Sequence, residues 1–374
     1  MRVLTLTPFF PSAADGARGC FVAEPLRALE AIGIESAVIA VEPIYRPTPM
    51  PNGHPASWVR YIAIPGRVGL ASAGFFLYET LRARVRRLHR EHHFDLIHAH
   101  AALPCGYAAM LLARDLQIAY VITVHGRDVF FRKQLPGVSG LWCQRVARTV
   151  YKSAARVICI SRTVASEIRQ HTGDVEVIYN GVDSGRFSPS GTSADRTVLS
   201  VGNLISTKGH ALLLRSFALL GPRYSDVQCE IIGEGPEQER LCRLASELGI
   251  ANRIQFRGRQ NRGQVAAAMS RCTLFALPSS YEGLGCVYLE AMASGKPVIG
   301  CRQQGIEEII THEKNGFLIN PEDLQGLTLT LSRLLDDADL RDRIGHEARE
   351  TILDRYTLRH QAQQLAQTYR DCAA

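Results

Sequence analysis

Two glutamates eight positions apart have the residue type and spacing for ligand chemistry in this 374-residue sequence. Glu282 and Glu290 lie in the segment SSYEGLGCVYLEAMASGKPVIG, in which Gly283 and Gly285 follow the first acid. Glycine allows the backbone to turn sharply and to approach a ligand closely. The free N–H groups of a helix that begins after this turn would form an anion site. A carboxylate one helical turn further in can accept hydrogen bonds from two neighbouring hydroxyls, as on ribose.

The flanking sequence predicts the elements that position these acids. Residues 272–277 are apolar and predict a buried strand before Glu282. A helix is expected over residues 286–294, because Gly295 provides a C-terminal stop and Pro297 prevents continuation. The alternative is an ordinary strand–turn–helix unit whose acids are solvated helix caps. Two acids that bracket a Gly-x-Gly turn favour a ligand site.

This segment resembles the E-x7-E signature of the retaining GT-B glycosyltransferases, and specifically of the large family 4. The resemblance spans nearly the whole chain and is most specific over residues 197–321. It implies an α/β fold of two doubly wound Rossmann-like domains that face a central cleft. It also implies that Glu290 holds the donor ribose and that Glu282 faces the transferred sugar and is catalytic. Three residues of the intervening turn would contact the donor: Gly283, Leu284 and Gly285.

A lysine at a second strand-to-helix turn is suited to a diphosphate. Lys208 lies in GNLISTKGH, after a strand predicted over residues 197–201. A solvated helix start is the alternative. Family 4 generally carries G-R-x-x-x-x-K-G, so the resemblance implies a catalytic, donor-binding Lys208, whereas Asn203 replaces the usual Arg. Asn donates a neutral hydrogen bond but supplies no charge, and Arg302 or helix N-termini are candidates to compensate.

Two further turns are expected to line the pocket for the nucleotide base. Gly235 belongs to a lone Gly-x-Gly after a predicted strand, without the third glycine of a dinucleotide fingerprint. The resemblance implies that Gly235, Phe256 and Gly258 contact the donor, largely through the backbone. Such contacts leave little trace in side-chain types, so uracil, guanine and adenine are not distinguished.

No metal site is expected. The acidic run from Asp336 to Asp339 has a D-x-D-like appearance, but it lies in a polar helix break far from any predicted strand end. We expect helix caps there, and also at Glu307 and Glu308. The resemblance implies a metal-independent enzyme without a cofactor, whose nucleotide diphosphate sugar is a substrate.

In the first half, polar residues follow the predicted strand over residues 120–124. The segment YVITVHGRD resembles the T-x-H-G element of family 4 at Thr123, His125 and Gly126. The resemblance implies that His125 is catalytic and faces the transferred sugar, and that Arg127 and Asp128 face the acceptor. A locally hydrogen-bonded core or surface histidine is the alternative.

Two more groups in the first half are candidates for the same site. His98 and His100 end the preceding strand and either line the cleft or form local hydrogen bonds. Gly16 and Gly19 precede the first helix, where family members often carry a glycine loop near the acceptor, so both are expected acceptor contacts.

Alternating strands and helices in both halves predict mostly parallel sheets that are covered on both faces. The expected strands are 3–7, 36–41, 59–64, 96–98, 120–124, 156–160, 197–201, 228–232, 254–256, 273–277 and 297–299. The expected helices are 18–32, 73–91, 105–115, 139–154, 162–171, 208–220, 236–247, 262–270 and 286–294, with a last one near 356–370. We expect an acceptor domain over residues 1–185 and a nucleotide-sugar domain over residues 186–355. Residues 356–374 would cross back to the first domain.

The basic charge is concentrated in the first half. Residues 1–189 carry 22 Lys and Arg against 14 Asp and Glu, whereas the remainder carries 21 against 22. Without a nucleic-acid motif, this indicates phosphate-bearing partners or an anionic membrane, with a plain solvated surface as the alternative. The helix near residues 75–90 is basic and amphipathic, so it either seats the protein on a membrane or covers the sheet with a solvated Arg face.

Composition and cysteine usage indicate a globular cytoplasmic protein, on the inner face of the plasma membrane if it binds lipid. The chain has 46% hydrophobic residues and no apolar run of the roughly 18 residues that a membrane helix needs. Ten cysteines are scattered without a C-x-x-C pair, which is typical of reduced thiols.

The predicted activity is metal-independent, retaining transfer of a hexose-type sugar from a nucleotide diphosphate to a hydroxyl of a carbohydrate or lipid-linked acceptor. The sequence around Glu290 is most similar to that of transferases of cell-surface polysaccharide, including teichuronic-acid and exopolysaccharide types. One alternative is another GT-B enzyme, such as a nucleotide-sugar 2-epimerase or a phosphorylase. Another is a non-catalytic nucleotide-sugar-binding or partner-binding module.

Overall fold

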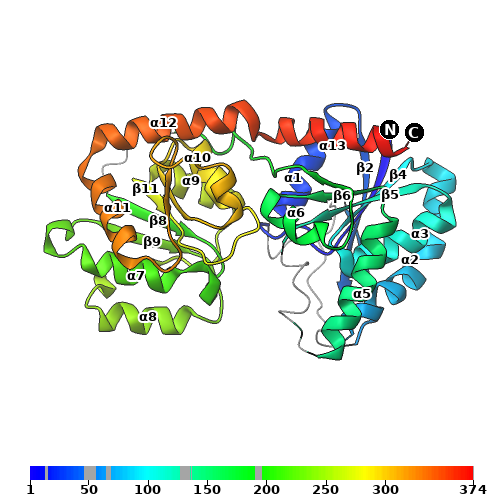
Figure 1. Cartoon of the computed structure of the whole chain (residues 1–374), viewed down its shortest axis with the longest axis horizontal. Coiled ribbons are helices and arrows are strands. Elements are labelled where there is room, and N and C mark those ends of the chain that lie inside the picture. The colour runs from blue at the N-terminus through cyan, green and yellow to red at the C-terminus, as the bar shows by residue number, and fades with distance from the viewer. Residues whose placement is uncertain are drawn as a thin grey trace. The chain divides into compact units, whose positions relative to one another are not determined.

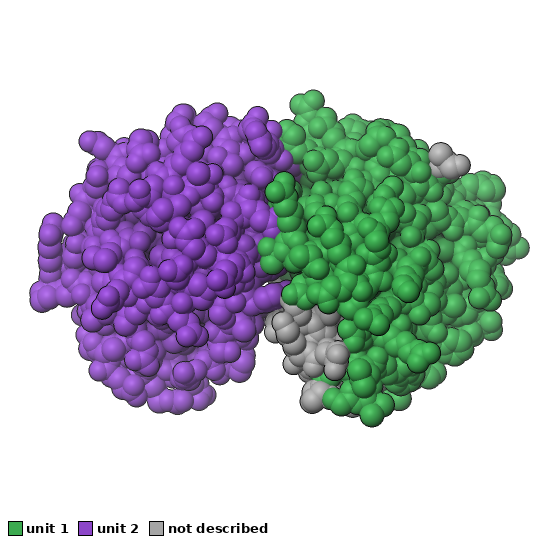
Figure 2. All heavy atoms as spheres, viewed as in Figure 1, with its two compact units in different colours: residues 1–180, 359–374 green, residues 181–358 purple. Residues whose placement is uncertain are grey.

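The computed structural model describes residues 1–12, 16–45, 56–64, 69–126, 135, 137–189 and 196–373. The chain forms two compact units, coloured separately in Figure 2. Unit 1 contains Met1–Asn180 and Arg359–Ala374, and unit 2 contains Gly181–Leu358. These divisions differ by a few residues from the expected ones at 185/186 and 355/356. A parallel bridge between Val182 and Thr357 accounts for the difference, because it ties both linker segments to unit 2.

Unit 1 has a parallel sheet of seven strands among its described residues, in the order β3-β2-β1-β4-β5-β6-β7. The strands are β1 Arg2–Thr7, β2 Glu35–Pro43, β3 Ala56–Tyr61, β4 Leu96–His100, β5 Ala119–Val124, β6 Arg156–Cys159 and β7 Val175–Val177. The helices are α1 Cys20–Glu30, α2 Leu70–His92, α3 Tyr107–Leu116, α5 Val138–Ser153, α6 Arg162–Arg169 and α13 Leu358–Ala373. In Figure 1, α2, α3 and α5 lie on one side of these strands, and α1, α6 and α13 lie on the other.

Unit 2 repeats the plan with a parallel sheet of six described strands, in the order β10-β9-β8-β11-β12-β13. The strands are β8 Thr197–Val201, β9 Gln228–Ile232, β10 Ile254–Phe256, β11 Leu274–Ala276, β12 Val298–Cys301 and β13 Phe317–Ile319. The helices are α7 His210–Leu219, α8 Gln238–Glu247, α9 Arg262–Arg271, α10 Cys286–Ala293, α11 Leu324–Asp336 and α12 Ala338–Arg355. Figure 1 shows α7 and α8 together on one side of the strands, with α9, α10 and α12 on the other.

The last helix is an integral part of unit 1. Ala362, Leu365, Ala366 and Tyr369 of α13 are buried in one apolar cluster with Val3 and other residues of the sheet. Burial of apolar side chains is the main favourable term in folding. Unit 1 is therefore completed by residues that follow unit 2 in the sequence.

The prediction of two α/β units with parallel sheets is confirmed, with errors at edge strands. The third strand was expected over residues 59–64, but β3 is Ala56–Tyr61, and Ile62 and Ile64 are exposed. The pairing ends at Tyr61, which lies opposite Pro43 and accepts a hydrogen bond from the Ile44 N–H at 2.9 Å. The short strands β7 and β13, at the outer edges of the two sheets, were missed.

Two compositional expectations can be compared with the described residues. All ten cysteines are free, and several, such as Cys159 and Cys272, are buried. Among the described helices, none combines the length and the apolar character needed to cross a bilayer.

Candidate functional site

In unit 2, the two candidate turns follow neighbouring strands. The turn with Asn203 and Lys208 follows β8, and the turn with Glu282 follows β11. β8 and β11 pair with each other at the point where the strand order of the sheet reverses. Ligands of open parallel sheets bind at such a point, because the loops on either side diverge beyond the carboxyl ends of the strands.

Lys208 and Glu282 form an ion pair that joins these two turns. Their side chains are only 19% and 10% exposed. Ser279 Oγ donates to the same carboxylate oxygen, Oε1, at 3.4 Å. Because both charges are largely removed from water, their interaction is screened less than that of a surface pair. The structure therefore brings together two of the three residues that were predicted to be catalytic.

Gln304 fixes the backbone of the Glu282 turn. Its Oε1 accepts a hydrogen bond from the Glu282 N–H at 2.8 Å, and its Nε2 donates to the Ser280 carbonyl at 3.0 Å. The Gly305 N–H donates to the Glu282 carbonyl at 3.1 Å. A Cβ on Gly305 would lie 2.0 Å from the Gly283 carbonyl oxygen, so only glycine fits this close approach. Gln304 is a buried clamp of the turn.

The turn then enters α10 through Gly285. This residue has a φ of 81°, and a Cβ there would lie 2.6 Å from the ring of Tyr288. Leu284 is fully buried beneath the turn. No side-chain cap is seen at the start of α10 among the described residues, and the partial positive charge of a helix N-terminus favours an anion there.

Glu290 lies one turn into α10 and is held by an arginine from α9. Arg262 Nη1 donates to Glu290 Oε1 at 2.5 Å, and the two side chains are 14% and 3% exposed. The Arg262 guanidinium also lies over the Phe187 ring, 4.7 Å from its centroid. A buried carboxylate requires such a partner, because its removal from water costs several kcal/mol.

The turns predicted to line the base pocket are joined through their backbones. The Gly233 N–H donates to the Gly258 carbonyl at 2.9 Å. Gly235 packs closely against Leu204, where a Cβ would lie 2.3 Å from the carbonyl oxygen. Phe256 is partly buried against the core of unit 2. The geometry of this region is thus set by backbone contacts that glycine permits.

The Asn203 turn has no arginine of its own. Asn203 is exposed. Arg302, the expected substitute, forms an ion pair with Glu307 at 3.5 Å. Beneath the turn, burial lowers the pKa of His210 to about 4, with nearby Lys208 a further cause. His210 is therefore a neutral support of this turn near pH 7.

In unit 1, the corresponding reversal of strand order lies between β1 and β4, and β5 is the next strand. His125 follows β5 directly. Its ring contacts Phe21 at 4.7 Å and Phe9 at 5.7 Å between centroids. Two aromatic side chains from the segments around the first turn therefore enclose the predicted catalytic histidine.

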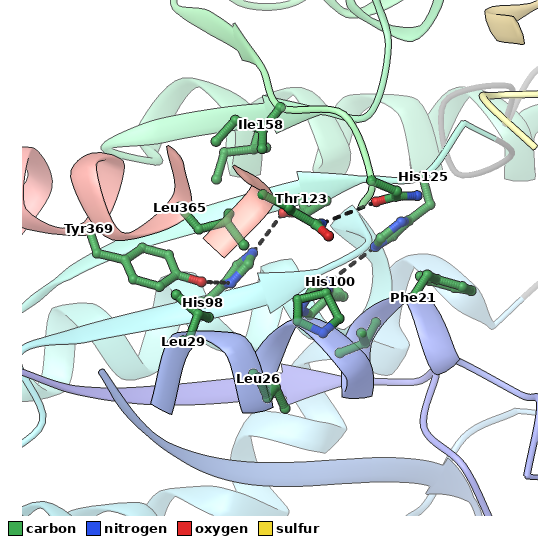
Figure 3. Close-up of a pocket in the computed structure, with 15 residues that line it drawn as sticks. Phe21, Leu26, Leu29, His98, His100, Thr123, His125, Ile158, Leu365 and Tyr369 are labelled. Atoms are coloured by element: carbon green, nitrogen blue, oxygen red, sulfur yellow. Dashed lines mark hydrogen bonds between the residues drawn. The ribbon is translucent and has the colours of Figure 1, made fainter. Parts of the chain in front are cut away.

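Three histidines, His98, His100 and His125, form a row across the ends of β4 and β5, which we call the imidazole row (Figure 3). His98 and His100 are buried, and the His125 Nε2 lies 3.0 Å from His100 Nδ1. Burial lowers the pKa of His98 and of His125 to about 3, and that of His100 to well below its ordinary value. The row is therefore neutral near pH 7. His98 and His100 form local hydrogen bonds, as one of the two expectations has it, and they line a small pocket of unit 1 with His125. That they line the substrate cleft stays a prediction.

The predicted acceptor residues are partly described. Gly16 is exposed, and Gly19, with a φ of 67°, packs so closely on the Phe9 backbone that a Cβ would lie 2.3 Å away. This contact joins the glycine turn to the aromatic surroundings of His125. Arg127 and Asp128 lie outside the described residues.

Of the acidic residues expected to cap helices, Asp337 does so, whereas no described side chain caps the short 3-10 helix Gly305–Glu308. The Asp337 carboxylate accepts from the Leu340 N–H at 2.9 Å at the start of α12. Glu307 Oε2 accepts from the Gln303 N–H at 2.6 Å. Among the described residues, no group of three His, Cys, Asp or Glu side chains is arranged to hold a metal ion.

The residues that the sequence analysis did not identify are partners of the predicted ones. Arg262, Phe187 and Gln304 in unit 2 and Tyr369 in unit 1 contact predicted site residues or their neighbours. Arg262 opens the helix after the base-lining turn, which was a usable signal. In a chain with so many arginines, that signal was weak.

Two family models together match most of the chain. The model described as glycosyl transferases group 1 matches residues 186–351. The model described as glycosyltransferase family 4 matches residues 21–186. The two matches meet at residue 186, near the division between the two units.

Three curated relatives are named for glycosyl transfer. An uncharacterized glycosyltransferase of Methanocaldococcus jannaschii is 30% identical over 68% of this chain and 70% of its own. The GDP-mannose-dependent alpha-(1-6)-phosphatidylinositol monomannoside mannosyltransferase of Mycolicibacterium smegmatis is 29% identical over 77% and 79%. A Bacillus subtilis protein assigned to teichuronic acid biosynthesis, TuaC, is 25% identical over 98% and 100%.

Solved structures share the fold over the whole chain. Sucrose-phosphate synthase of Thermosynechococcus elongatus superposes with a TM-score of 0.83 and 22% identity, over 99% of each chain. The Anabaena protein HepE in complex with UDP-glucose superposes with a TM-score of 0.76 and 22% identity, over 99% of this chain and 100% of its own. At such identities the superpositions establish the fold alone.

Proposed function

The chain belongs to the group 1 and family 4 glycosyltransferases, and we propose that it is a retaining, metal-independent transferase of cell-surface polysaccharide biosynthesis. Its donor would be a nucleotide diphosphate sugar, and its acceptor a hydroxyl of a carbohydrate or a lipid-linked glycan. The names of the relatives, which include a phosphatidylinositol mannoside mannosyltransferase and a teichuronic acid protein, support this substrate class. The epimerase, phosphorylase and binding-module alternatives gain no support from these relatives.

The observation that carries the proposal is the Lys208–Glu282 pair at the strand-order reversal of unit 2. A diphosphate offers the Lys208 ammonium the same kind of anionic partner as the Glu282 carboxylate does. The start of α10 adds N–H groups with the partial positive charge of a helix N-terminus. Glu290, one turn further along the same helix, is then in place for the ribose hydroxyls.

In the proposed reaction, the bond between the anomeric carbon and the diphosphate oxygen breaks, and its electron pair stays on the departing phosphate. The acceptor hydroxyl oxygen forms the new bond on the same face of the sugar, and its proton goes to that phosphate. Lys208 and the α10 amides stabilise the developing negative charge, which is the work of preorganised dipoles. Glu282 and His125 would hold sugar hydroxyls.

Thermal stabilisation by UDP, GDP and ADP tests the donor site. A ligand that binds only the native state raises the melting temperature by mass action. We expect one of the three to raise it, and Glu290→Ala to abolish the shift. The matched control is Glu239→Ala, at a fully solvated glutamate of α8 whose side chain is 90% exposed. No shift with any nucleotide would contradict the proposal.

Product analysis tests the reaction itself. With the donor identified, we expect slow hydrolysis to water and faster transfer to a suitable acceptor, with the anomeric configuration kept. Proton NMR of the product reports that configuration directly. An inverted product, or a nucleotide sugar epimerised without acceptor, would contradict retaining transfer.

We also propose that unit 1 rests on an anionic membrane at the cytoplasmic face. Phe75 and Phe76 of α2 and Leu141 and Trp142 of α5 are exposed. Both helices follow parallel strands, so they begin at the carboxyl edge of the sheet, where His125 also lies. Exposed apolar side chains beside arginines are typical of surfaces that bind lipid head groups.

The arginines of α2 are less available to anionic lipid than the sequence indicated, because several of them have acidic partners. Among the described residues, Arg82, Arg86 and Arg87 pair with Glu79, Asp115 and Glu91. The pairs of Arg82 and Arg87 are exposed and weak, since surface ion pairs contribute about 0–1 kcal/mol, whereas Asp115, the partner of Arg86, is only 19% exposed. The aromatic side chains therefore carry more of the proposed contact than the arginines do.

Vesicle co-sedimentation tests this contact. We expect binding to vesicles that contain phosphatidylglycerol and less binding to pure phosphatidylcholine. The double substitution Phe75→Ser and Phe76→Ser should weaken binding, whereas Leu219→Ser, at an exposed leucine of unit 2, should not. Equal loss in both variants would contradict a docking surface on α2.

A further inference from the structure

The imidazole row of unit 1 is anchored at its inner end by the last helix of the chain. The hydroxyl of Tyr369, on α13, lies 2.7 Å from His98 Nδ1, and His98 Nε2 lies 2.7 Å from Thr123 Oγ1 (Figure 3). Tyr369 is 1% exposed and Thr123 is 6% exposed. Both ring nitrogens of a buried His98 are therefore satisfied, which fixes the plane of this ring.

Ring contacts extend this order from His98 to His125. The centroids of His98 and His100 lie 4.3 Å apart with an interplanar angle of 35°. Those of His100 and His125 lie 5.2 Å apart with an angle of 19°. In a close-packed interior, a shift of one ring displaces its neighbour. The position of His125 thus depends on His100, and that of His100 on His98.

The hydrogen bond at the outer end also couples the tautomers of His100 and His125. A neutral imidazole has one donor nitrogen and one acceptor nitrogen. His100 Nδ1 and His125 Nε2 lie 3.0 Å apart, so one of them carries the hydrogen and the other accepts it. The tautomer of His100 therefore decides which nitrogen of His125 carries its proton.

The pocket beside the row is too small to be a substrate site. It has a volume of about 20 Å³, which accommodates about one water molecule but no sugar. Asn180 and Gln361 line the same pocket, and Gln361 Nε2 donates to Asn180 Oδ1 at 3.4 Å. Because the chain passes between the units at 180/181 and 358/359, residues next to both passages contact this pocket.

We propose that Tyr369, His98 and His100 are positioning residues for His125: Tyr369 and His98 set its ring orientation through the neighbouring rings, and His100 sets its tautomer through the hydrogen bond. The C-terminal helix is thereby part of the sugar-facing site and not only a cover of the sheet. This proposal rests on the proposed function, because it takes its purpose from the contact of His125 with the transferred sugar. None of the three residues is placed in contact with substrate.

Tyr369→Phe tests the inner end of the row, because it removes the hydroxyl and keeps the ring. We expect kcat to fall about 3- to 10-fold, in the range of one lost neutral hydrogen bond, with little change in donor KM. Tyr120→Phe is the matched control, since Tyr120 is a buried tyrosine of the same unit whose hydroxyl donates to the Val150 carbonyl at 2.5 Å. Equal effects on kcat in both variants would overturn the proposal.

His100→Leu and His100→Asn test the outer end. Leucine has no nitrogen to offer His125, whereas the asparagine amide occupies nearly the place of an imidazole Nδ1. We expect kcat to fall about 10- to 100-fold in His100→Leu, in proportion to a buried hydrogen-bonding group left unsatisfied, and to recover in part in His100→Asn. Equal activities in the two variants would overturn a positioning role.

Imidazole ¹⁵N chemical shifts give a readout that needs no activity. We expect the His125 Nδ1 and Nε2 shifts to change in Tyr369→Phe and in both His100 variants, and to stay constant in Tyr120→Phe. Unchanged His125 shifts would overturn the proposal even if activity fell. If the wild type bound no nucleotide and transferred no sugar, the proposed function would fail, while these shifts would still decide whether the row sets the His125 tautomer.

Discussion

Both units place polar side chains at the carboxyl ends of parallel strands, but these side chains are charged in unit 2 and neutral in unit 1. Unit 2 places formal charges at its strand-order reversal, in the pairs Lys208–Glu282 and Arg262–Glu290. Unit 1 places neutral imidazoles within the last residues of β4 and directly after β5, with pKa values of about 3 for His98 and His125 because of burial. The two units therefore suit different parts of a nucleotide sugar. Charge suits the nucleotide diphosphate, and neutral hydrogen-bonding groups suit the hydroxyls of a sugar.

The two sites are also supported differently. In unit 2, Arg262 of α9 forms an ion pair with Glu290, and Gln304, which follows β12, accepts a hydrogen bond from the Glu282 N–H. In unit 1, the support for His125 comes from His100 and ends on Tyr369 of the C-terminal helix. Substitutions of charged residues in unit 2 should therefore have larger effects than those in unit 1.

The largest expected effect follows removal of the Glu282 charge. Glu282→Gln keeps the shape of the side chain but loses the ion pair with Lys208 and the charge at the transferred sugar. We expect kcat to fall about 10²- to 10³-fold, as for the loss of one electrostatic contact at a reacting centre. Steady-state kinetics with Glu239→Gln as control measure it. A fall of less than about fivefold would place the chemistry elsewhere.

Loss of the Arg262 charge should reduce stability as well as donor binding. Arg262→Met leaves the buried Glu290 carboxylate without its partner. We expect the free energy of unfolding to fall by about 3 kcal/mol, as for other broken buried pairs. Arg333→Met is the control, because its pair with Glu313 is exposed and worth about 0–1 kcal/mol. Denaturant titration compares the two, and equal losses would contradict a buried, structural pair.

His125→Ala should have a smaller effect than Glu282→Gln. A neutral imidazole that holds a sugar hydroxyl contributes about 1–3 kcal/mol, so we expect kcat to fall about 10- to 100-fold. Its pKa of about 3 also predicts a wild-type kcat without a histidine inflection between pH 5 and 8. An inflection near pH 6.5 that His125→Ala removes would show that this histidine titrates during turnover.

The smallest effect near neutral pH is a difference in acid sensitivity between the units. The unfolded chain binds protons at its histidines below about pH 6.5, whereas the folded chain does not, because the pKa of His98 and of His125 is about 3. Stability should therefore fall as the pH drops below 6.5. Among its described residues, unit 1 has four histidines with a lowered pKa, His98, His100, His125 and His171, whereas unit 2 has His210. Hydrogen exchange at pH 7.5 and at pH 5 gives the protection factors of the backbone amides. We expect these protection factors to fall more in β4 and β5 than in β8 and β11 when the pH is lowered from 7.5 to 5.

Much of the fold and part of the site could be predicted from sequence. Alternating apolar runs and helical stretches predicted the two parallel sheets, because the period of each element is written in adjacent residues. Edge strands were misplaced or missed, since strands as short as β7 and β13 give little periodicity. Lys208 and Glu282 were predicted because each follows a buried strand, and parallel sheets bring their carboxyl ends to one edge.

The partners of these residues could not be predicted in the same way. Gln304 binds the Glu282 turn from 22 residues away. Arg262 reaches Glu290 across 28 residues. These contacts depend on how α9 and the turn after β12 pack beside α10, and adjacent sequence does not encode that.

The sequence by itself determined which groups stand at the strand ends of each unit. Local spacing, glycine turns and hydrophobic period are short-range properties. They placed Lys208, Glu282 and His125 after their strands and Glu290 in the helix that follows. Only the tertiary structure decided what holds each of them and in which charge state. His98 and Tyr369 meet across 271 residues, and the neutrality of the imidazole row arises from burial by both α1 and α13. Desolvation is a property of the assembled interior, so it appears only when the last helix returns to the first unit.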